Sequence, residues 1–108
     1  MLKRALELKG YRVVEAADGV EAYYEVRRNR PNLLIIDLNM PRMDGLETIK
    51  LIRKLKGEVG RIPIVAITAF DVYGMEDAAL QLGSDRYLSK PINLDDFDRT
   101  LKSLGFLV

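Results

Sequence analysis

The sequence predicts an α/β domain in which helices cover both faces of a parallel β-sheet, giving a three-layer sandwich. Continuous apolar runs at 33–36 and 64–67 are typical of strands that are buried on both faces. Segments with helical spacing of apolar residues separate and follow these runs. Strands that alternate with helices in a chain of 108 residues indicate right-handed crossovers, and the length suits one domain over 1–108.

The first third of the chain predicts two helices with a short strand between them. The first helix has apolar residues on one face, and Gly10 is placed to end it. Two valines within 13–16 predict a short strand that is polar enough to lie at an edge. Asp18, with Glu21 three residues later, forms a capping pattern that begins the second helix. This helix ends before Pro31, because the residue that precedes a proline disfavours helical backbone angles.

The rest of the chain predicts three further units, each a strand followed by a helix. The strands are expected at 33–36, 64–68 and 87–89. The helices that follow them are expected to begin at Asp44, near Met75 and at Asn93. In a parallel sheet the carboxyl ends of the strands meet at one edge, and ligands of such folds bind beyond that edge.

The composition excludes several classes of function. The chain has 17 basic and 16 acidic residues, a net charge of +1, which gives no reason to expect binding to nucleic acid or to a membrane. It has no cysteine and no histidine, which excludes disulfides, the usual zinc sites and histidine-based acid–base catalysis. No apolar run has membrane-spanning length and no signal-peptide pattern opens the chain, so a cytoplasmic protein is expected.

Three polar residues follow three of the predicted strands: Asp37, Thr68 and Lys90. Considered alone, each has a simpler explanation, as an acceptor for loop amides, a strand-end hydroxyl and a partner of a surface carboxylate. Together, a carboxylate, a hydroxyl and an ammonium group can receive a phosphoryl group. The carboxylate attacks phosphorus, and the other two groups bind the phosphoryl oxygens.

The segments around these residues carry a family resemblance. The run Asp37–Gly45, the strand end Ile67–Ala69 and the segment Tyr87–Pro91 resemble the receiver domains of response regulators in two-component signalling. The resemblance covers about 2–104. It implies a flavodoxin-like parallel sheet of strand order 2-1-3-4-5 and a cis bond before Pro91.

The resemblance also implies roles for individual residues. Asp37 would accept the phosphoryl group from a histidine kinase or a phosphotransfer protein. Thr68 and Lys90 would contact its oxygens, and Asp37 with the backbone carbonyl of Asn39 would bind Mg²⁺. Thr68 and Tyr87 would act as the switch. The family's fourth helix, fifth strand and fifth helix correspond here to the helix that begins near Met75, the strand at 87–89 and the helix that begins at Asn93. These elements would then bind a downstream protein partner, so the chain is expected to be a signalling protein and not an enzyme.

The chain departs from the family at its start. Receiver domains begin with a central strand that ends in an acidic pair, and this sequence lacks that strand and that pair, so its Mg²⁺ site is incomplete. The apolar side chains of a central strand contribute a free energy of burial that is comparable to the whole free energy of unfolding of a small domain. Three outcomes are therefore open: strand 13–16 pairs with 33–36 in a rearranged sheet, two chains form a homodimer by strand exchange, or the sequence is an N-terminally truncated copy.

Two other functions remain open from the sequence. A receiver-like interaction module, or a truncated remnant, would bind a partner without being phosphorylated. A flavodoxin-like nucleotide or flavin binder would need a phosphate-binding loop after the first strand, and the sequence offers none there. No other cofactor is expected.

Overall fold

The computed structural model describes residues 2–39 and 44–107. The α-helices are α1 (Leu2–Leu8), α2 (Gly19–Asn29), α3 (Gly45–Arg53), α4 (Met75–Leu82) and α5 (Leu94–Ser103). The strands are β1 (Leu34–Asp37), β2 (Ile64–Thr68) and β3 (Arg86–Ser89), and a short 3-10 helix, η1 (Glu58–Arg61), precedes β2. The predicted loop positions Met40–Met43 lie outside the described residues.

In the described part of the chain the sheet has three parallel strands in the order β1-β2-β3. All five residues of β2 are buried, as expected for the middle strand of a sheet that is covered on both faces. The register pairs Asp37 with Ile67 and Thr68 with Ser89, so the carboxyl ends of the strands lie level at one edge. The predicted parallel α/β architecture is therefore confirmed.

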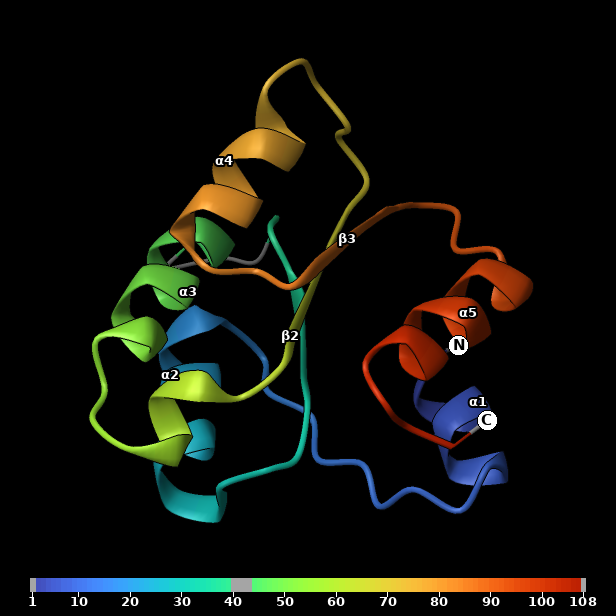
Figure 1. The fold of residues 1–108 in the computed structure, drawn as a ribbon, viewed down its shortest axis with the longest axis horizontal. Coiled ribbons are helices and arrows are strands. Elements are labelled where there is room, and N and C mark those ends of the chain that lie inside the picture. Colours follow the sequence, from blue (N-terminus) through green and yellow to red (C-terminus); the bar gives the residue numbers. More distant parts are fainter. Residues whose placement is uncertain (1, 40–43, 108) are drawn as a thin grey trace.

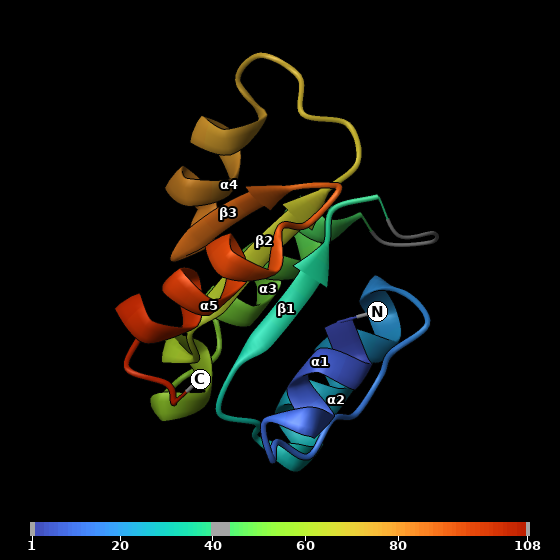
Figure 2. The same cartoon turned by 90° about the vertical axis from the view of Figure 1, so that its right-hand side faces the viewer.

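Helices cover both faces of this sheet. One core cluster lies between the sheet and helices α2, α3 and α4, and contains Val26, Ile36, Ile49, Ile52 and Ile64. A second cluster joins Leu6 of α1 to Phe97 and Leu101 of α5, and Leu33, Ile35 and Leu88 pack against it. Figures 1 and 2 show α1 and α5 on one face and the other three helices on the opposite face. This is the predicted three-layer sandwich.

The predicted caps explain where three helices begin. The Asp18 carboxylate accepts a hydrogen bond from the Glu21 amide at 2.9 Å, and the Asp44 carboxylate accepts one from the Glu47 amide at 2.8 Å. Asn93 accepts hydrogen bonds from two amides in the first turn of α5. Local sequence therefore determines the starts of α2, α3 and α5.

The predicted strand at 13–16 is wrong, because no strand occurs between α1 and α2. Among the described residues, no backbone hydrogen bond joins this segment to β1. In this segment Val13 packs against the second core cluster, and Tyr11, two residues before it, donates a 2.5 Å hydrogen bond to the Leu107 carbonyl. The rearranged sheet, with 13–16 beside β1, is therefore not the arrangement found. Strand exchange between two chains remains a prediction.

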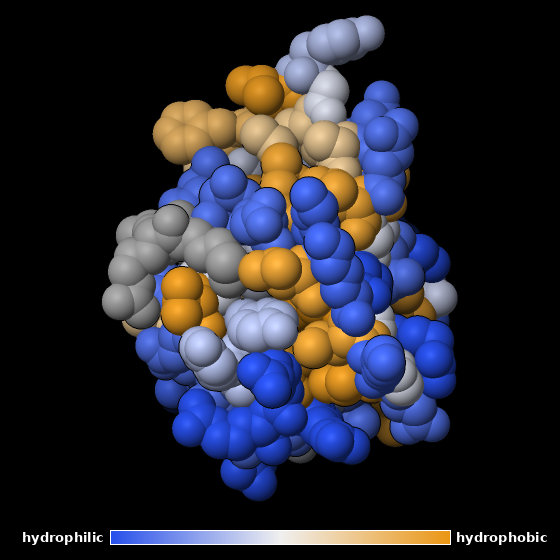
Figure 3. Space-filling view, turned by 90° about the vertical axis from the view of Figure 1, so that its left-hand side faces the viewer, coloured by the Kyte–Doolittle hydropathy of each residue, from blue (hydrophilic) through white to orange (hydrophobic). Residues whose placement is uncertain are grey.

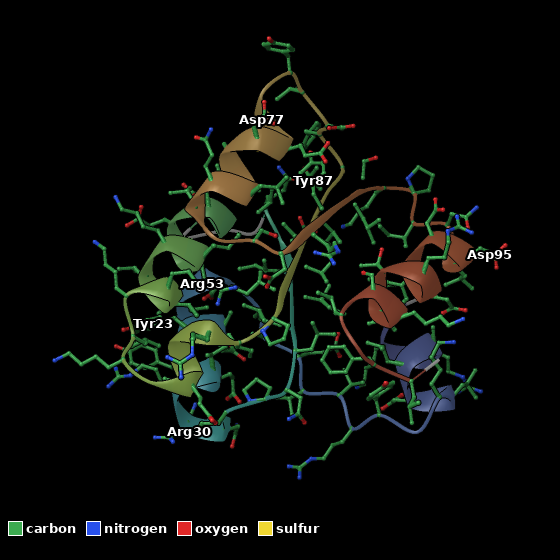
Figure 4. The ribbon with its side chains drawn as sticks, in the orientation of Figure 1. Tyr23, Arg30, Arg53, Asp77, Tyr87 and Asp95 are labelled. Carbon is green, nitrogen blue, oxygen red and sulfur yellow. The ribbon has the colours of Figure 1, made fainter. Side chains whose placement is uncertain are left out.

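Arg53, the last residue of α3 (labelled in Figure 4), joins this helix to the connection before β2 and to the connection between α4 and β3. Its guanidinium donates hydrogen bonds to the carbonyls of Gly83, Gly60 and Ile62 at 2.7–2.9 Å, and to the Asp85 carboxylate at 3.1 Å. Burial lowers the pKa of Arg53, and the charge and hydrogen bond of Asp85 oppose this effect. A single side chain therefore satisfies three main-chain carbonyls.

The helices of the described part of the chain are all too short, or too polar, to cross a bilayer. On the face formed by α2, α3 and α4, hydrophobic residues lie at the end that carries the β2–α4 loop and continue down the middle of the face between hydrophilic side chains, and the opposite end is hydrophilic (Figure 3). The loop over 69–74 exposes Phe70, Val72 and Tyr73, and the Tyr73 side chain is fully exposed. Apolar groups therefore lie near the edge of the sheet where the strands end.

Candidate functional site

The ends of the three strands bring Asp37, Thr68 and Lys90 to one edge of the sheet. Asp37 is the last residue of β1, Thr68 is the last residue of β2, and Lys90 directly follows β3. The Lys90 amide donates a 2.7 Å hydrogen bond to the Thr68 carbonyl, which continues the β2–β3 pairing by one residue. The sheet geometry thus places all three side chains as the strand-end argument predicted.

Asp37 and Lys90 form an ion pair at this edge. The Lys90 Nζ lies 2.6 Å from Oδ2 of Asp37, and the backbone amide of Asn39 donates a 2.9 Å hydrogen bond to Oδ1. Both side chains keep contact with solvent, since 29% of the Asp37 side chain and 40% of the Lys90 side chain are exposed. The carboxylate is therefore held by two partners and is still accessible from solvent.

Thr68 contacts Asn39 and not Asp37. The Thr68 hydroxyl donates a 2.7 Å hydrogen bond to Oδ1 of Asn39 and accepts one from the Phe70 amide at 3.0 Å. The Ala69 amide also donates to Oδ1 of Asn39, at 3.2 Å. Thr68 is completely buried. From the sequence, Asn39 was expected to act only through its backbone carbonyl, and no motif in the sequence indicated this contact of its side chain.

Tyr87 connects β3 to the β2–α4 loop (Figure 4). Its hydroxyl donates a 2.9 Å hydrogen bond to the Asp71 carboxylate, and its ring packs against the first core cluster. Burial raises the pKa of Tyr87 to about 12, with further contributions from the hydrogen bond and charge of Asp71 and the charge of Glu76. Tyr87 is therefore neutral at physiological pH, and its hydrogen bond to Asp71 links β3 to the loop that follows Thr68.

The residues at this edge fit Mg²⁺ poorly. Within 2–39 and 44–107, no group of three or more carboxylate, histidine or cysteine side chains is placed to hold a metal ion. Mg²⁺ requires near-octahedral oxygen ligation, commonly with carboxylate ligands. Asp37 already binds Lys90 and the Asn39 amide, and the side-chain oxygen of Asn39 binds Thr68 and Ala69. The described donors therefore do not form a magnesium site of the usual composition.

The bond between Lys90 and Pro91 is cis, as the resemblance implied. The arrangement as a whole presents a carboxylate, an ammonium group and a nearby hydroxyl at the carboxyl edge of a parallel sheet. Such a set can receive an anionic group at the carboxylate and neutralise its charge. It contains no histidine and no thiol, because the chain has neither histidine nor cysteine.

Comparison with known proteins gives matches over almost the whole chain. The chain is 35% identical over 103 residues to the polar-differentiation response regulator DivK of Brucella anthropi, covering 95% of this chain and 83% of DivK. It is also 41% identical over 103 residues to the response regulator MprA of Mycobacterium leprae, and this match covers 95% of the chain and 44% of MprA. The chain thus spans less than half of MprA.

Solved structures show the same fold. A putative response regulator from Chloroflexus aurantiacus superimposes with a TM-score of 0.88 at 31% identity, covering 96% of this chain and 84% of that chain. The receiver domain of a sensor histidine kinase from Pseudomonas aeruginosa, which has a magnesium ion coordinated in its active-site cleft, gives a TM-score of 0.84 at 32% identity. That match covers 94% of this chain and 83% of the other. Residues 1–102 match the response regulator receiver domain. The chain therefore belongs to the receiver domain family of two-component response regulators.

Proposed function

We propose that this chain is the phosphoacceptor of a two-component phosphorelay and that Asp37 receives the phosphoryl group. The observation that carries the proposal is the 2.6 Å pair between Asp37 and Lys90 at the carboxyl edge of the sheet. An accessible carboxylate beside a fixed ammonium group suits the transfer of a phosphoryl dianion, because the main requirement is charge neutralisation. Membership of the receiver family supports the same role.

The transfer itself needs only the groups described. A carboxylate oxygen of Asp37 forms a bond to phosphorus while the bond from phosphorus to the donor's leaving group breaks. Lys90 then exchanges its carboxylate partner for a phosphoryl oxygen. The Thr68 hydroxyl, on the adjacent strand, donates to a second phosphoryl oxygen. Asp37 is modified once per event, so the proposal describes a signalling protein and not a catalyst of turnover.

The proposal includes partners and a location that rest on the family. A histidine kinase or a phosphotransfer protein supplies the phosphoryl group, and a downstream protein binds the surface of α4, β3 and α5. Tyr87 and the loop over 69–74 connect this surface to Thr68. The near-neutral net charge supports protein partners in place of nucleic acid or membrane, and the proposed location is the cytoplasm.

Weak binding of Mg²⁺ is expected at this site. The relative from Pseudomonas aeruginosa holds a magnesium ion, but in this chain Asp37 and Asn39 are the ligands that the resemblance supplies. Because the described donors do not fit the ion, no step of the transfer is assigned to it. Phosphorylation is therefore expected to depend only weakly on the concentration of Mg²⁺.

Homodimer formation by strand exchange is also proposed. The amides of Leu34, the first residue of β1, and of Leu38, the residue after it, donate to the carbonyls of Pro63 and Ile67. The backbone groups of Ile35 and Asp37 therefore face the opposite edge of β1. No described residue forms a backbone hydrogen bond to that edge. An unpaired strand edge favours association with another strand. Sedimentation equilibrium should give a mass twice that of the chain, and a monomer at all concentrations would refute the exchange.

A second candidate is a receiver-like interaction module that is not phosphorylated. The observation that favours it is the number of partners already bound to Asp37, together with the poor set of metal donors. This module would present the same surface around α4, β3 and α5 without responding to a phosphodonor.

Intact mass spectrometry after incubation with acetyl phosphate distinguishes the two candidates. The Asp37→Asn variant removes the proposed acceptor, and Asp95→Asn, in the exposed first turn of α5, is the matched control (Figure 4). A single phosphoryl adduct in the wild type and in Asp95→Asn, absent in Asp37→Asn, is the expected result with and without Mg²⁺. No adduct on the folded wild-type chain would favour the interaction module.

A further inference from the structure

Asn39 bridges two residues that the proposed transfer requires. Its backbone amide donates to Oδ1 of Asp37 at 2.9 Å, and its side-chain oxygen accepts from the Thr68 hydroxyl at 2.7 Å. The same oxygen accepts from the Ala69 amide at 3.2 Å. One residue in the loop after β1 is therefore bonded both to the proposed acceptor and to the end of β2.

The identity of the bridging atom follows from its partners. The Ala69 backbone amide can only donate, so the atom that it contacts must be the carbonyl oxygen of the Asn39 amide and not its nitrogen. A threonine hydroxyl has one proton, and Thr68 donates this proton to Asn39. Thr68 therefore cannot donate to a phosphoryl oxygen while this bond is intact.

Burial of Thr68 further limits the movement of its side chain away from Asn39. Thr68 has no solvent-exposed surface, and its β-branched side chain has few accessible rotamers. Its oxygen also accepts from the Phe70 amide, so a rotation of the hydroxyl alters contacts of the β2–α4 loop. The Thr68 hydroxyl is thus held by two hydrogen bonds, one that it donates to Asn39 and one that it accepts from the Phe70 amide.

We propose that the Asn39 side chain is a latch that holds Thr68 and Ala69 in the unphosphorylated arrangement, and that phosphorylation of Asp37 must break it. This inference rests on the proposed function and assigns Asn39 a positioning role in regulation of the same site. The phosphoryl group competes with the Asn39 oxygen for the single proton of Thr68. Breaking the latch also frees the Ala69 amide, and so couples Asp37 to the loop that exposes Phe70 and Tyr73.

Hydrogen exchange of the Ala69 amide in the unphosphorylated chain tests whether the latch exists. Asn39→Ala removes the acceptor oxygen but keeps the backbone amide that contacts Asp37. Exchange at Ala69 should become about three- to tenfold faster, the range expected for loss of one neutral hydrogen bond. Asn39→Asp retains an acceptor oxygen and should keep the wild-type protection. Asn32→Ala, an exposed site before β1, is the matched control.

The initial rate of adduct formation with acetyl phosphate tests whether the latch acts through Thr68. Asn39→Ala should react about three- to tenfold faster than the wild type, because Thr68 becomes free to donate. In a Thr68→Val background the same substitution should change the rate by less than about twofold, because the two residues are then uncoupled. An equal acceleration in both backgrounds would show that Asn39 does not act through Thr68.

The two proposals fail in different ways. Unchanged Ala69 exchange in a folded Asn39→Ala variant would overturn the latch, whatever the reactivity of Asp37. Absence of an adduct on the wild-type chain would contradict the proposed function, while the exchange data would still decide whether Asn39 holds the end of β2.

Discussion

Replacement of Lys90 by methionine separates its proposed chemical role from any structural role. The substitution keeps an unbranched side chain of similar length but removes the ammonium group that lies 2.6 Å from Asp37. The backbone amide of residue 90, which donates to the Thr68 carbonyl, is retained. Only the charge interaction at the edge of the sheet is therefore changed.

The expected effects on stability and on reactivity differ in size. Both partners are partly exposed, and exposed ion pairs contribute about 0.2–1 kcal/mol to folding, so the free energy of unfolding should change by less than about 1 kcal/mol. A hydrogen bond from a charged donor to a phosphoryl oxygen is worth about 1.5–3 kcal/mol. Since 1.4 kcal/mol corresponds to a factor of ten, adduct formation should slow by about 10- to 100-fold.

Two measurements on the same preparation test this prediction. Urea unfolding followed by circular dichroism gives the free energy of unfolding, and mass spectrometry after timed exposure to acetyl phosphate gives the rate. Lys56→Met, an exposed lysine after α3, is the control for the loss of one positive charge. Undiminished adduct formation in Lys90→Met would refute the chemical role. A loss of stability above about 3 kcal/mol would show that the pair is structural.

Two further predictions concern the hydrogen bonds of Arg53 and the pKa of Tyr87. Arg53→Met should lower the free energy of unfolding by about 3 kcal/mol in urea titrations, because three main-chain carbonyls lose a charged donor; Arg12→Met, at an exposed site, should change it by less than about 0.5 kcal/mol. The pKa of Tyr87 is raised from 10.0 to about 12, so its stabilising contribution is complete below pH 10 and is lost as the pH rises toward 12. The thermal midpoint of the wild type should therefore fall more steeply between pH 10 and 12 than that of Tyr87→Phe, and parallel curves would contradict this assignment.

The parts of the fold that depend on local sequence were predictable. Asp18 and Asp44 begin helices because each carboxylate reaches an amide in the first turn, an interaction set by residues three apart. The run 64–67 is apolar throughout, and β2, which contains it, is buried along its whole length as the central strand. The edge position of Asp37, Thr68 and Lys90 followed from the same reasoning, since parallel strands end together.

Features that depend on a distant partner were not predictable. The valines in 13–16 have the residue preference of a strand, but a strand forms only where a neighbour offers backbone groups in register, and this segment pairs with none of the described strands. Arg53 gathers carbonyls from three separate positions, and no spacing in the sequence indicates such a contact. The Asn39–Thr68 bond likewise joins residues 29 positions apart.

Identification of the phosphorylated residue decides whether Asp37 is the phosphoacceptor. After reaction with acetyl phosphate, borohydride reduction of an acyl phosphate marks the modified carboxylate, and peptide mass spectrometry then locates it. We expect a mark confined to Asp37 in the wild type and no mark in Asp37→Asn. A mark on another carboxylate that persists in Asp37→Asn would contradict the assignment of the site.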